Sequence, residues 1–279
     1  MDKCIGVIGA GTMGRGVAQR FAIYGYEVVL VDIKEEILNE AIKEIRQNLR
    51  VGNMFQAKYN VEEILGRIHT TLDYKDLQHM EYIVENTSEI MEIKEKVYEE
   101  LEKVCKESCI YMVDTSCIPI SSIGSLTMRP EQVIGVHFMN PVTMKNFAEV
   151  IRGKSTSDNT VNITREILKT VDIEIEVIND SAGFVSNRIS HLYMNEAASL
   201  VHEGIARVEQ IDNIFKKAFG HKMGPLETAD LIGIDTVVNS LDILYKEYRD
   251  KKFQACQLLT KMVSKGELGR KSRKGFYSY

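Results

Sequence analysis

Three glycines near the start of the chain have the spacing of a phosphate-binding turn. They follow the apolar run Ile5–Ile8 and precede a segment with a helical pattern. The first glycine of such a turn lets the chain leave a strand tightly, the second lets backbone approach a pyrophosphate, and the third lets the helix pack on the sheet. The helix N-terminus adds unpaired N–H groups and a partial positive charge. We therefore predict a dinucleotide site in which the contacting residues are Gly9, Gly11, Thr12, Met13 and Gly14.

A carboxylate follows at the position expected for binding ribose. Asp32 closes the second apolar run, Val28–Val31, and lies 18 residues after Gly14. A carboxylate there accepts hydrogen bonds from the adenosine ribose hydroxyls and repels a 2′-phosphate. The sequence therefore predicts that the cofactor is NAD rather than NADP.

A second set of polar residues follows two further apolar runs. Asp114 and Ser116 come at the end of the run 110–114, and His137 ends the run 133–137, shortly before Asn140. In a doubly wound sheet, ligands bind beyond the carboxyl ends of the strands. These side chains are therefore expected to converge on the cofactor crevice and to form a substrate site.

Two more polar residues belong to this predicted site. Glu149 follows in the same half of the chain, and Asn187 lies on the first helix of a second domain. Three of the site residues also have a structural interpretation. His137 could be a buried histidine at a strand end, Ser116 a serine that caps a helix, and Glu149 a surface acid. Convergence near a cofactor favours the functional interpretation.

The arrangement of apolar runs predicts the fold. Strands are expected at Ile5–Ile8, Val28–Val31, Tyr82–Glu85, Ile110–Asp114, Val133–His137 and Glu174–Ile178. Helices are expected between them at Gly14–Tyr24, Lys34–Val51, Ile93–Lys106 and Asp158–Thr170. Such alternation indicates a largely parallel, doubly wound Rossmann-type α/β domain, which we place at residues 1–182.

Residues 183–279 are expected to form an all-α domain. Val185, Ile189, Leu192, Glu196 and Leu200 fall on one stripe of a long helix. Further helices are expected at Val208–Ala218, Gly233–Tyr248 and Phe253–Lys265, and Pro225 is placed to begin another. A domain this small does not bury its apolar stripes easily by itself, so we predict a homodimer.

The composition excludes several classes of protein. The formal net charge is −5 and the pI is near 5.8, which argues against nucleic acid or an anionic membrane as a partner. The first residues do not resemble a signal peptide, so a cytoplasmic location is expected. Five scattered cysteines are then expected to be reduced thiols. Cys105 and Cys109 share the spacing of a helix face, but no histidine lies close enough in sequence to predict a metal site.

Several longer motifs resemble those of the 3-hydroxyacyl-CoA dehydrogenases. In size the chain is similar to the bacterial 3-hydroxybutyryl-CoA dehydrogenases. The motifs are Ser116, Gly135–Pro141, Glu149–Ile151, Gly183–Arg188, Met223–Glu227, Gly233–Asp235, Gly269–Lys271 and Gly275–Tyr277. The similarity extends over essentially the whole chain.

The resemblance implies a role for each site residue. His137 would act as general base and take the proton from the substrate hydroxyl while hydride leaves C3. Glu149 would hold the other imidazole nitrogen, and Ser116 and Asn187 would hydrogen-bond the oxygen at C3. By resemblance, Glu89 and Lys94 line the cofactor site; the alternative for Lys94 is a solvated helix charge.

The chain also departs from the family pattern. The usual Asn-Thr-Ser is Asp114-Thr115-Ser116, and an acid there favours a polar acyl group with extra hydroxyls. The helical hairpin that would grip CoA, Gln47–Arg67, is short and only modestly basic. One alternative substrate is therefore a glyceryl-like thioester on an acyl carrier protein, as in polyketide extender-unit biosynthesis. The candidate docking residues for such a carrier are Arg46, Arg50, Lys58 and Arg67.

Three further alternatives remain open on the sequence alone. The chain could oxidise a free polyol acid, which saturation by a free hydroxy acid would show. It could be a non-catalytic NAD-binding protein such as the crystallins built on this fold, against which the intact Ser116, His137, Glu149 and Asn187 argue. A flavoprotein is disfavoured because no second nucleotide motif is evident.

Overall fold

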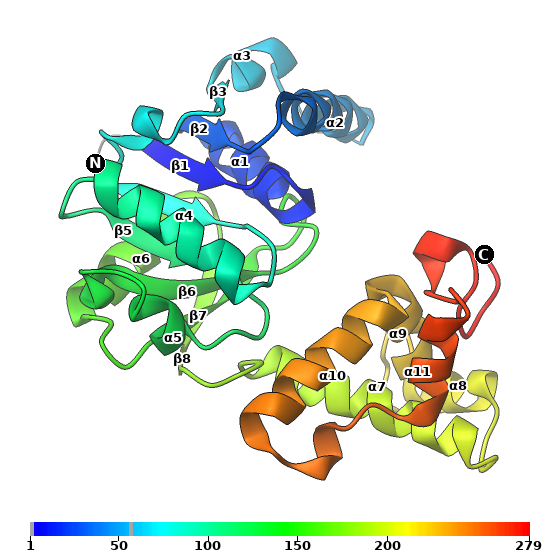
Figure 1. Ribbon diagram of the computed structural model, residues 1–279. Coiled ribbons are helices and arrows are strands. Elements are labelled where there is room, and N and C mark those ends of the chain that lie inside the picture. Colours follow the sequence, from blue (N-terminus) through cyan, green and yellow to red (C-terminus); the bar gives the residue numbers. More distant parts are fainter. Residues whose placement is uncertain (1–2, 56–57) are drawn as a thin grey trace. The chain divides into compact units, whose positions relative to one another are not determined.

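The computed structural model describes residues 3–55 and 58–279. It divides into two compact units, Met1–Ser181 and Ala182–Tyr279, one residue from the boundary expected above (Figure 1). In the described part of the chain, no helix combines the length and the apolar character needed to cross a membrane.

The first unit is built on one sheet. Its strands are β1 (Cys4–Ile8), β2 (Glu27–Val31), β3 (Ile68–Thr71), β4 (Tyr82–Glu85), β5 (Ile110–Val113), β6 (Val133–Phe138), β7 (Phe147–Arg152) and β8 (Glu174–Asn179). Among the described residues the strand order is β3-β2-β1-β4-β5-β6-β7-β8. Neighbouring strands are parallel except for β6 and β7, which are antiparallel. The predicted doubly wound, largely parallel sheet is confirmed.

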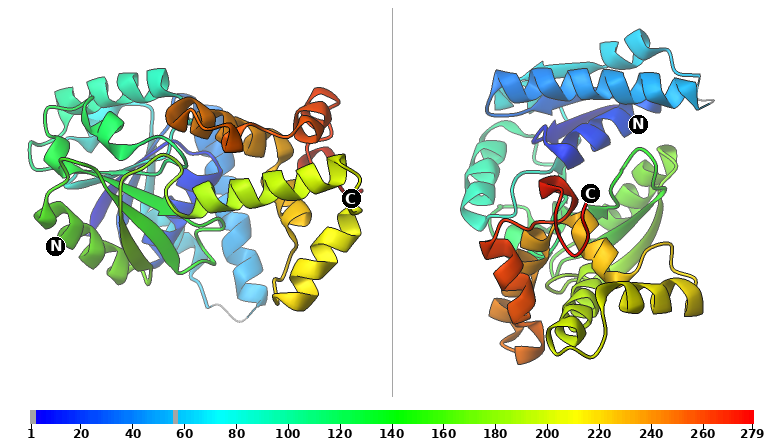
Figure 2. Two further views of the ribbon diagram at one scale, coloured as in Figure 1. Left: turned by 90° about the horizontal axis from the view of Figure 1, so that it is seen from below. Right: turned by 90° about the vertical axis from the view of Figure 1, so that its right-hand side faces the viewer.

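Helices cover both faces of this sheet (Figures 1 and 2). They are α1 (Thr12–Ile23), α2 (Glu35–Met54), α3 (Val61–Gly66), α4 (Met91–Val104), α5 (Ile120–Gly124) and α6 (Asp158–Thr170), with short 3-10 turns at Tyr74–Leu77 and Pro130–Gln132. Apolar side chains of α1, α2 and α6 join those of the strands in one buried core, while α4 and α5 lie on the opposite face. The sheet therefore has the two covered faces that parallel strands require.

Two strands of the sheet were not predicted from the sequence. β3 is short and contains His69, Thr70 and Thr71, so it lacks an apolar run. β7 contains Glu149, which interrupts its apolar pattern, yet both the strand and this carboxylate are buried. The antiparallel register of β6 and β7 places His137 directly opposite Glu149.

The second unit is helical, as expected. Its helices are α7 (Ser186–His202), α8 (Val208–Ala218), α9 (Pro225–Ile232), α10 (Ile234–Tyr248) and α11 (Gln257–Ser264), with 3-10 turns at Lys251–Phe253 and Arg270–Ser272. Pro225 begins α9 as predicted. The core is formed where α7, α9, α10 and α11 meet around Met194, Leu226 and Leu241.

The predicted apolar stripe of α7 is not the face that this unit buries. Val185 and Ile189 are 49% and 63% exposed, whereas Met194 and Ala198 are fully buried. The stripe was assigned to a core face because its residue types are apolar. The actual core face instead includes the polar side chains of His191 and Asn195.

Buried carboxylates fix the C-terminal segment of the second unit. Asp230 accepts hydrogen bonds from the backbone N–H groups of Phe276 and Tyr277, both at 2.9 Å. Asp212 accepts from the N–H of Leu226 at 2.9 Å and from the Tyr277 hydroxyl at 2.7 Å. The final residues are therefore held by the body of the unit.

Candidate active site

The glycine turn after β1 has the geometry that the sequence predicts. Gly9 adopts φ +88°, a left-handed conformation that favours glycine, and a Cβ there would lie 2.8 Å from the carbonyl oxygen of Asn86. A Cβ on Gly14 would collide with the carbonyl oxygen of Gly9. Both residues are therefore glycine because the strand, turn and helix pack closely.

Gly11 differs from these two glycines. A Cβ added at Gly11 would meet no protein atom within 4 Å, so the packing of the protein does not explain its lack of a side chain. Gly11 is also the N-cap of α1, which has no side-chain cap and no acidic residue in its first turn. Open space at an uncapped helix N-terminus fits a bound pyrophosphate.

Asp32 lies at the carboxyl end of β2 beside this turn. Its Oδ2 accepts a hydrogen bond from the Ala10 N–H at 2.7 Å, and its Oδ1 accepts from the Ile33 N–H at 2.7 Å. The carboxylate therefore holds the glycine turn, and its binding of ribose stays a prediction.

The buried ion pair of Glu85 and Lys94 was not predicted. Lys94 Nζ lies 2.7 Å from Glu85 Oε2, and both side chains are fully buried. Glu85 Oε1 also accepts a hydrogen bond from the Thr87 N–H at 2.6 Å. The interpretation of Lys94 as a solvated helix charge is wrong. The sequence carried one signal, an acid at the end of the apolar run of β4, but nothing indicated its partner.

Glu89 organises the loop that carries Ser116. Its Oε1 accepts hydrogen bonds from the Thr115 hydroxyl at 2.6 Å and from the N–H groups of Cys117 and Ile118 at 2.8 and 3.0 Å. The Ser116 N–H lies 3.2 Å from both carboxylate oxygens. Ser116 is not a helix cap, because α5 begins at residue 120 with Pro119 as its N-cap.

His137 and Glu149 form the central pair of the site. His137 Nδ1 lies 3.0 Å from Glu149 Oε2, and the two residues are 9% and 5% exposed. Each lies in a strand, so the register of β6 and β7 fixes their separation. Because a carboxylate accepts hydrogen bonds, the pair requires the proton on Nδ1.

Asp114 lies next to this pair, at the carboxyl end of β5. Its Oδ1 accepts a hydrogen bond from the Phe138 N–H at 3.3 Å, whereas its buried Oδ2 has no hydrogen-bond partner in the described structure. Burial raises the pKa of Asp114 to about 7, against the opposing effects of the charge of His137 and the bond from Phe138. An acid of this kind changes its charge near neutral pH.

The remaining predicted residues lie in different places. Asn140 is exposed and precedes a cis proline, Pro141. Asn187 lies in the first turn of α7 in the second unit, and its carbonyl accepts a hydrogen bond from His191 Nδ1 at 2.7 Å. The first unit thus places Asp114 beside the pair of His137 and Glu149, and the approach of Ser116 and Asn187 to them stays a prediction.

A strained turn places Asn187 at the start of its helix. Gly183 and Phe184 both have positive φ, at +72° and +50°, and Phe184 is buried. A Cβ on Gly183 would lie 2.6 Å from the Leu244 side chain. Left-handed backbone at a bulky residue is costly and often marks a functional site.

Comparison with known proteins identifies relatives over the full length of the chain. Residues 4–181 match the family model "3-hydroxyacyl-CoA dehydrogenase, NAD binding domain", and residues 183–279 match "3-hydroxyacyl-CoA dehydrogenase, C-terminal domain". A probable 3-hydroxybutyryl-CoA dehydrogenase of Deinococcus radiodurans is 42% identical, covering 98% of this chain and 99% of its own. A 3-hydroxybutyryl-CoA dehydrogenase of Clostridioides difficile is 40% identical, covering 99% of each chain.

A solved structure agrees with these sequence matches. The crystal structure of the (S)-3-hydroxybutyryl-CoA dehydrogenase of Ralstonia eutropha matches with a TM-score of 0.95 at 34% identity. The match covers 100% of this chain and 99% of the other.

Proposed function

Because the chain belongs to the 3-hydroxyacyl-CoA dehydrogenase family and is an NAD-dependent oxidoreductase, we propose that it interconverts a 3-hydroxyacyl thioester and its 3-oxoacyl form with His137 as general base. The observation that carries this proposal is the buried pair of His137 and Glu149 at 3.0 Å. A neutral imidazole held by a carboxylate takes a proton at its other nitrogen and is stabilised once charged. NAD, when bound, supplies the hydride acceptor.

The steps assigned to this chain's residues concern the proton and the oxygen at C3. With Nδ1 donating to Glu149, Nε2 of His137 is the atom that takes the hydroxyl proton in oxidation and returns it in reduction. Ser116 and Asn187 supply hydrogen bonds to that oxygen while its charge changes. Glu89 acts on Ser116 through the loop, because its carboxylate accepts hydrogen bonds from four consecutive residues, 115–118.

In this proposal, different residues bind different parts of NAD. Backbone of the turn from Gly9 to Gly14, including Thr12 and Met13, faces the pyrophosphate, and Asp32 binds the ribose. In this proposal Glu89 and Lys94 line the site by fixing the ends of β4 and β5, since both of their charged groups are engaged by protein partners.

A CoA thioester with a short acyl chain is the substrate class that we propose. The relatives named above are 3-hydroxybutyryl-CoA dehydrogenases. The unpartnered Oδ2 of Asp114 favours an acyl group that offers a hydroxyl, and Asn140 is a further substrate contact in this proposal.

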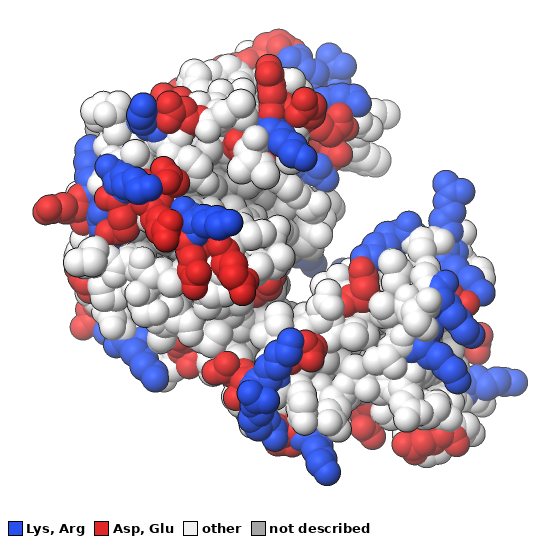
Figure 3. Space-filling model, viewed as in Figure 1, with Lys and Arg blue, Asp and Glu red and all other residues white. Residues whose placement is uncertain are grey.

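The carrier-protein alternative depends on a basic surface that is partly neutralised. Arg46 forms an ion pair with Glu62, and Arg67 with Glu63. Acidic and basic side chains interleave over α2 and α4 on the face drawn in Figure 3. The hairpin 47–67 also includes residues 56–57, which lie outside the described residues. We keep the carrier protein as an outcome of the test.

We also propose that the second unit mediates a homodimer. Its exposed apolar side chains include Ile189, Ile205, Ile214, Phe219 and Leu231. Exposed apolar surface of this kind marks association sites. Size-exclusion chromatography with light scattering distinguishes a dimer from a monomer.

Consumption of NADH with acetoacetyl-CoA, beside the same acyl group on a carrier protein, tests the proposed function. Rapid turnover of the CoA thioester supports it, and turnover of the carrier thioester alone supports the carrier alternative. Saturation by a free hydroxy acid instead would identify a polyol-acid dehydrogenase. NADH binding without turnover of any of these substrates would leave the non-catalytic interpretation.

A further inference from the structure

The carboxylate of Asp180 binds the amino end of α5 from a distant part of the chain. Asp180 directly follows β8 and lies 60 residues after Ile120. Its Oδ1 accepts a hydrogen bond from the Ile120 N–H at 2.9 Å, and its Oδ2 accepts one from the Ser121 N–H at 2.7 Å. The N-cap of α5, Pro119, supplies no side-chain cap. Asp180 therefore takes the place of a cap that the local sequence lacks.

Asp180 and Glu89 together bind the backbone of residues 116–121, which we call the serine segment. Residues 116–119 form neither helix nor strand, so secondary structure supplies no acceptor for their N–H groups. Glu89 accepts hydrogen bonds from the N–H groups of residues 116–118 at 3.2, 2.8 and 3.0 Å. Pro119 has no N–H group, and Asp180 binds the two residues that follow. The two carboxylates thus bind every N–H group of the serine segment.

The backbone of Asp180 is itself fixed to the strand that carries Glu149. The Asp180 N–H donates to the carbonyl oxygen of Arg152, the last residue of β7, at 3.1 Å. Ser121 adds a second link to the chain just beyond this strand, because its Oγ accepts a hydrogen bond from the Lys154 N–H at 2.9 Å. The α5 end of the serine segment is therefore anchored to β7.

We propose that Asp180 is a positioning residue for the reaction and acts through Ser116. The proposal rests on the proposed function, in which the Ser116 hydroxyl hydrogen-bonds the oxygen at C3. Glu89 fixes the serine segment at its Ser116 end, and Asp180 fixes it at its α5 end. Hydrogen bonds to a carboxylate are stronger than those between neutral groups, so the two contacts limit the movement of a segment that mostly lacks secondary structure. Loss of the Asp180 carboxylate frees the α5 end, and the Ser116 hydroxyl then loses its fixed position.

Kinetics of Asp180→Ala with acetoacetyl-CoA and NADH test this role. We expect kcat to fall between about 10-fold and about 10²-fold, because a small misplacement of a group that contacts the reacting atoms is costly. The KM for NADH should stay unchanged, since the predicted NAD contacts at Gly9–Gly14 and Asp32 are left intact. Asp180→Asn, which keeps one side-chain oxygen as an acceptor, should lose less.

A double-mutant cycle separates positioning from a merely structural role. In the Ser116→Ala background, Asp180→Ala should cause no further loss of kcat, because the group that Asp180 positions is already absent. A loss of kcat that is equally large with and without the Ser116 hydroxyl would overturn the proposal. Asp180→Asn replaces Asp180→Ala in the cycle if the alanine variant does not fold.

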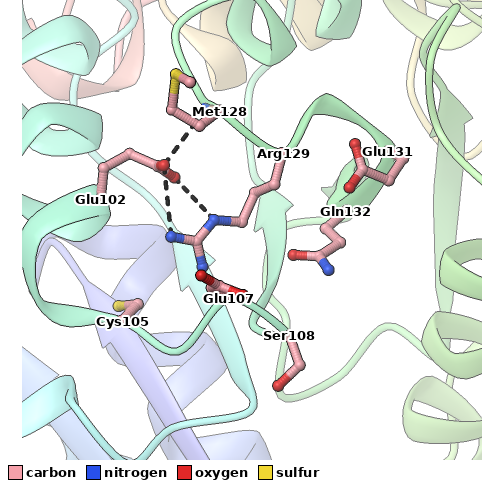
Figure 4. A pocket seen from close by; sticks show the side chains of 8 residues that line it. All are labelled: Glu102, Cys105, Glu107, Ser108, Met128, Arg129, Glu131 and Gln132. Atoms are coloured by element: carbon pink, nitrogen blue, oxygen red, sulfur yellow. Dashed lines mark hydrogen bonds and ion pairs between the residues drawn. The ribbon is translucent and has the colours of Figure 1, made fainter.

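The matched control is a carboxylate at the opposite end of β5. Glu102 lines a surface pocket of about 780 Å³ at the amino ends of β5 and β6 (Figure 4). Cys105, the C-cap of α4, lines the same pocket, and Cys109 lies beyond that helix, so the two cysteines do not share the predicted helix face. Glu102 accepts a hydrogen bond from the Met128 N–H at 3.3 Å, and its Oε1 lies 3.1 Å from Arg129 Nε. Glu102→Ala removes this partner of Arg129, so the free energy of unfolding should fall while kcat stays unchanged.

Hydrogen exchange followed by peptide mass spectrometry tests the positioning without an assay of turnover. In Asp180→Ala the amides of the whole serine segment should exchange faster than in the unaltered protein, including those of residues 116–118, although Glu89 is still present. In Glu102→Ala they should exchange as in the unaltered protein. Unchanged exchange at residues 116–118 in Asp180→Ala would refute the positioning. Failure of the unaltered protein to turn over acetoacetyl-CoA would instead contradict the proposed function, and hydrogen exchange would then decide by itself whether Asp180 holds the serine segment.

Discussion

The Asp114 carboxyl should make the stability of the protein depend on pH, and asparagine at this position should remove that dependence. Burial raises the pKa of Asp114 to about 7 in the folded chain, against about 4 for an ordinary aspartate. An acid whose pKa rises on folding binds its proton more tightly in the folded state. The free energy of unfolding therefore falls as pH rises from the unfolded pKa to the folded pKa, and levels off above it.

The size of this effect follows from the two pKa values. A difference of about three pKa units corresponds to about 4 kcal/mol over the whole interval. From about pH 5 to about pH 8, the loss in the free energy of unfolding due to Asp114 is about 2–3 kcal/mol. Relaxation of water around the partly exposed side chain reduces this loss to about 2 kcal/mol. The variant Asp114→Asn keeps an oxygen for the Phe138 N–H but has no charge to bury.

Urea unfolding at the two pH values provides the assay. We expect the free energy of unfolding of Asp114→Asn, taken relative to that of the unaltered protein, to rise by about 2 kcal/mol from about pH 5 to about pH 8. Asp76→Asn, at an exposed aspartate of the same unit, should gain nothing. An equal difference between Asp114→Asn and the unaltered protein at both pH values would refute the reasoning.

Four further substitutions test three separate parts of the site. Asp32→Ala should weaken NAD binding and relax discrimination against NADP, measured as the ratio of kcat/KM for the two cofactors; an unaltered ratio would mean that other groups hold the ribose. Lys94→Met should cost about 3–5 kcal/mol of stability in urea unfolding, because Glu85 is left buried and unpaired. Adding Glu85→Gln should recover part of that loss, and no recovery would contradict the ion-pair account. Glu149→Gln should lower kcat on the order of 10²-fold or more with NADH affinity retained, because His137 loses its negatively charged partner; an unchanged kcat would remove Glu149 from the mechanism.

The glycine turn and the strand ends could be predicted because each depends on local sequence. Gly9 and Gly14 are required by backbone conformation and close packing, and both requirements appear directly as residue type. His137 follows a continuous apolar run, so its position at the carboxyl end of a buried strand could be inferred. The placement of Asp32 after β2 followed from the same kind of pattern.

The spacing of these residues does not predict their partners, since the partners depend on pairing across the sheet; only the family resemblance implied that Glu149 pairs with His137. Glu149 meets His137 only because β7 runs antiparallel to β6, and the charge within β7 hid that strand. Lys94 has the spacing of an ordinary surface lysine, and only the packing of α4 on β4 reveals its burial against Glu85. The prediction that the stripe containing Ile189 is a core face was wrong, because apolar residue types alone do not show whether a helix face is buried.

The central claim is that His137 is the general base, and one variant tests it most directly. His137→Gln should lower kcat with acetoacetyl-CoA on the order of 10²–10⁴-fold, the usual contribution of a general base. NADH binding, followed by fluorescence titration, should stay nearly unchanged. His69→Gln, at an exposed histidine on β3, serves as the matched control and should retain full activity. Undiminished turnover in His137→Gln would contradict the mechanism.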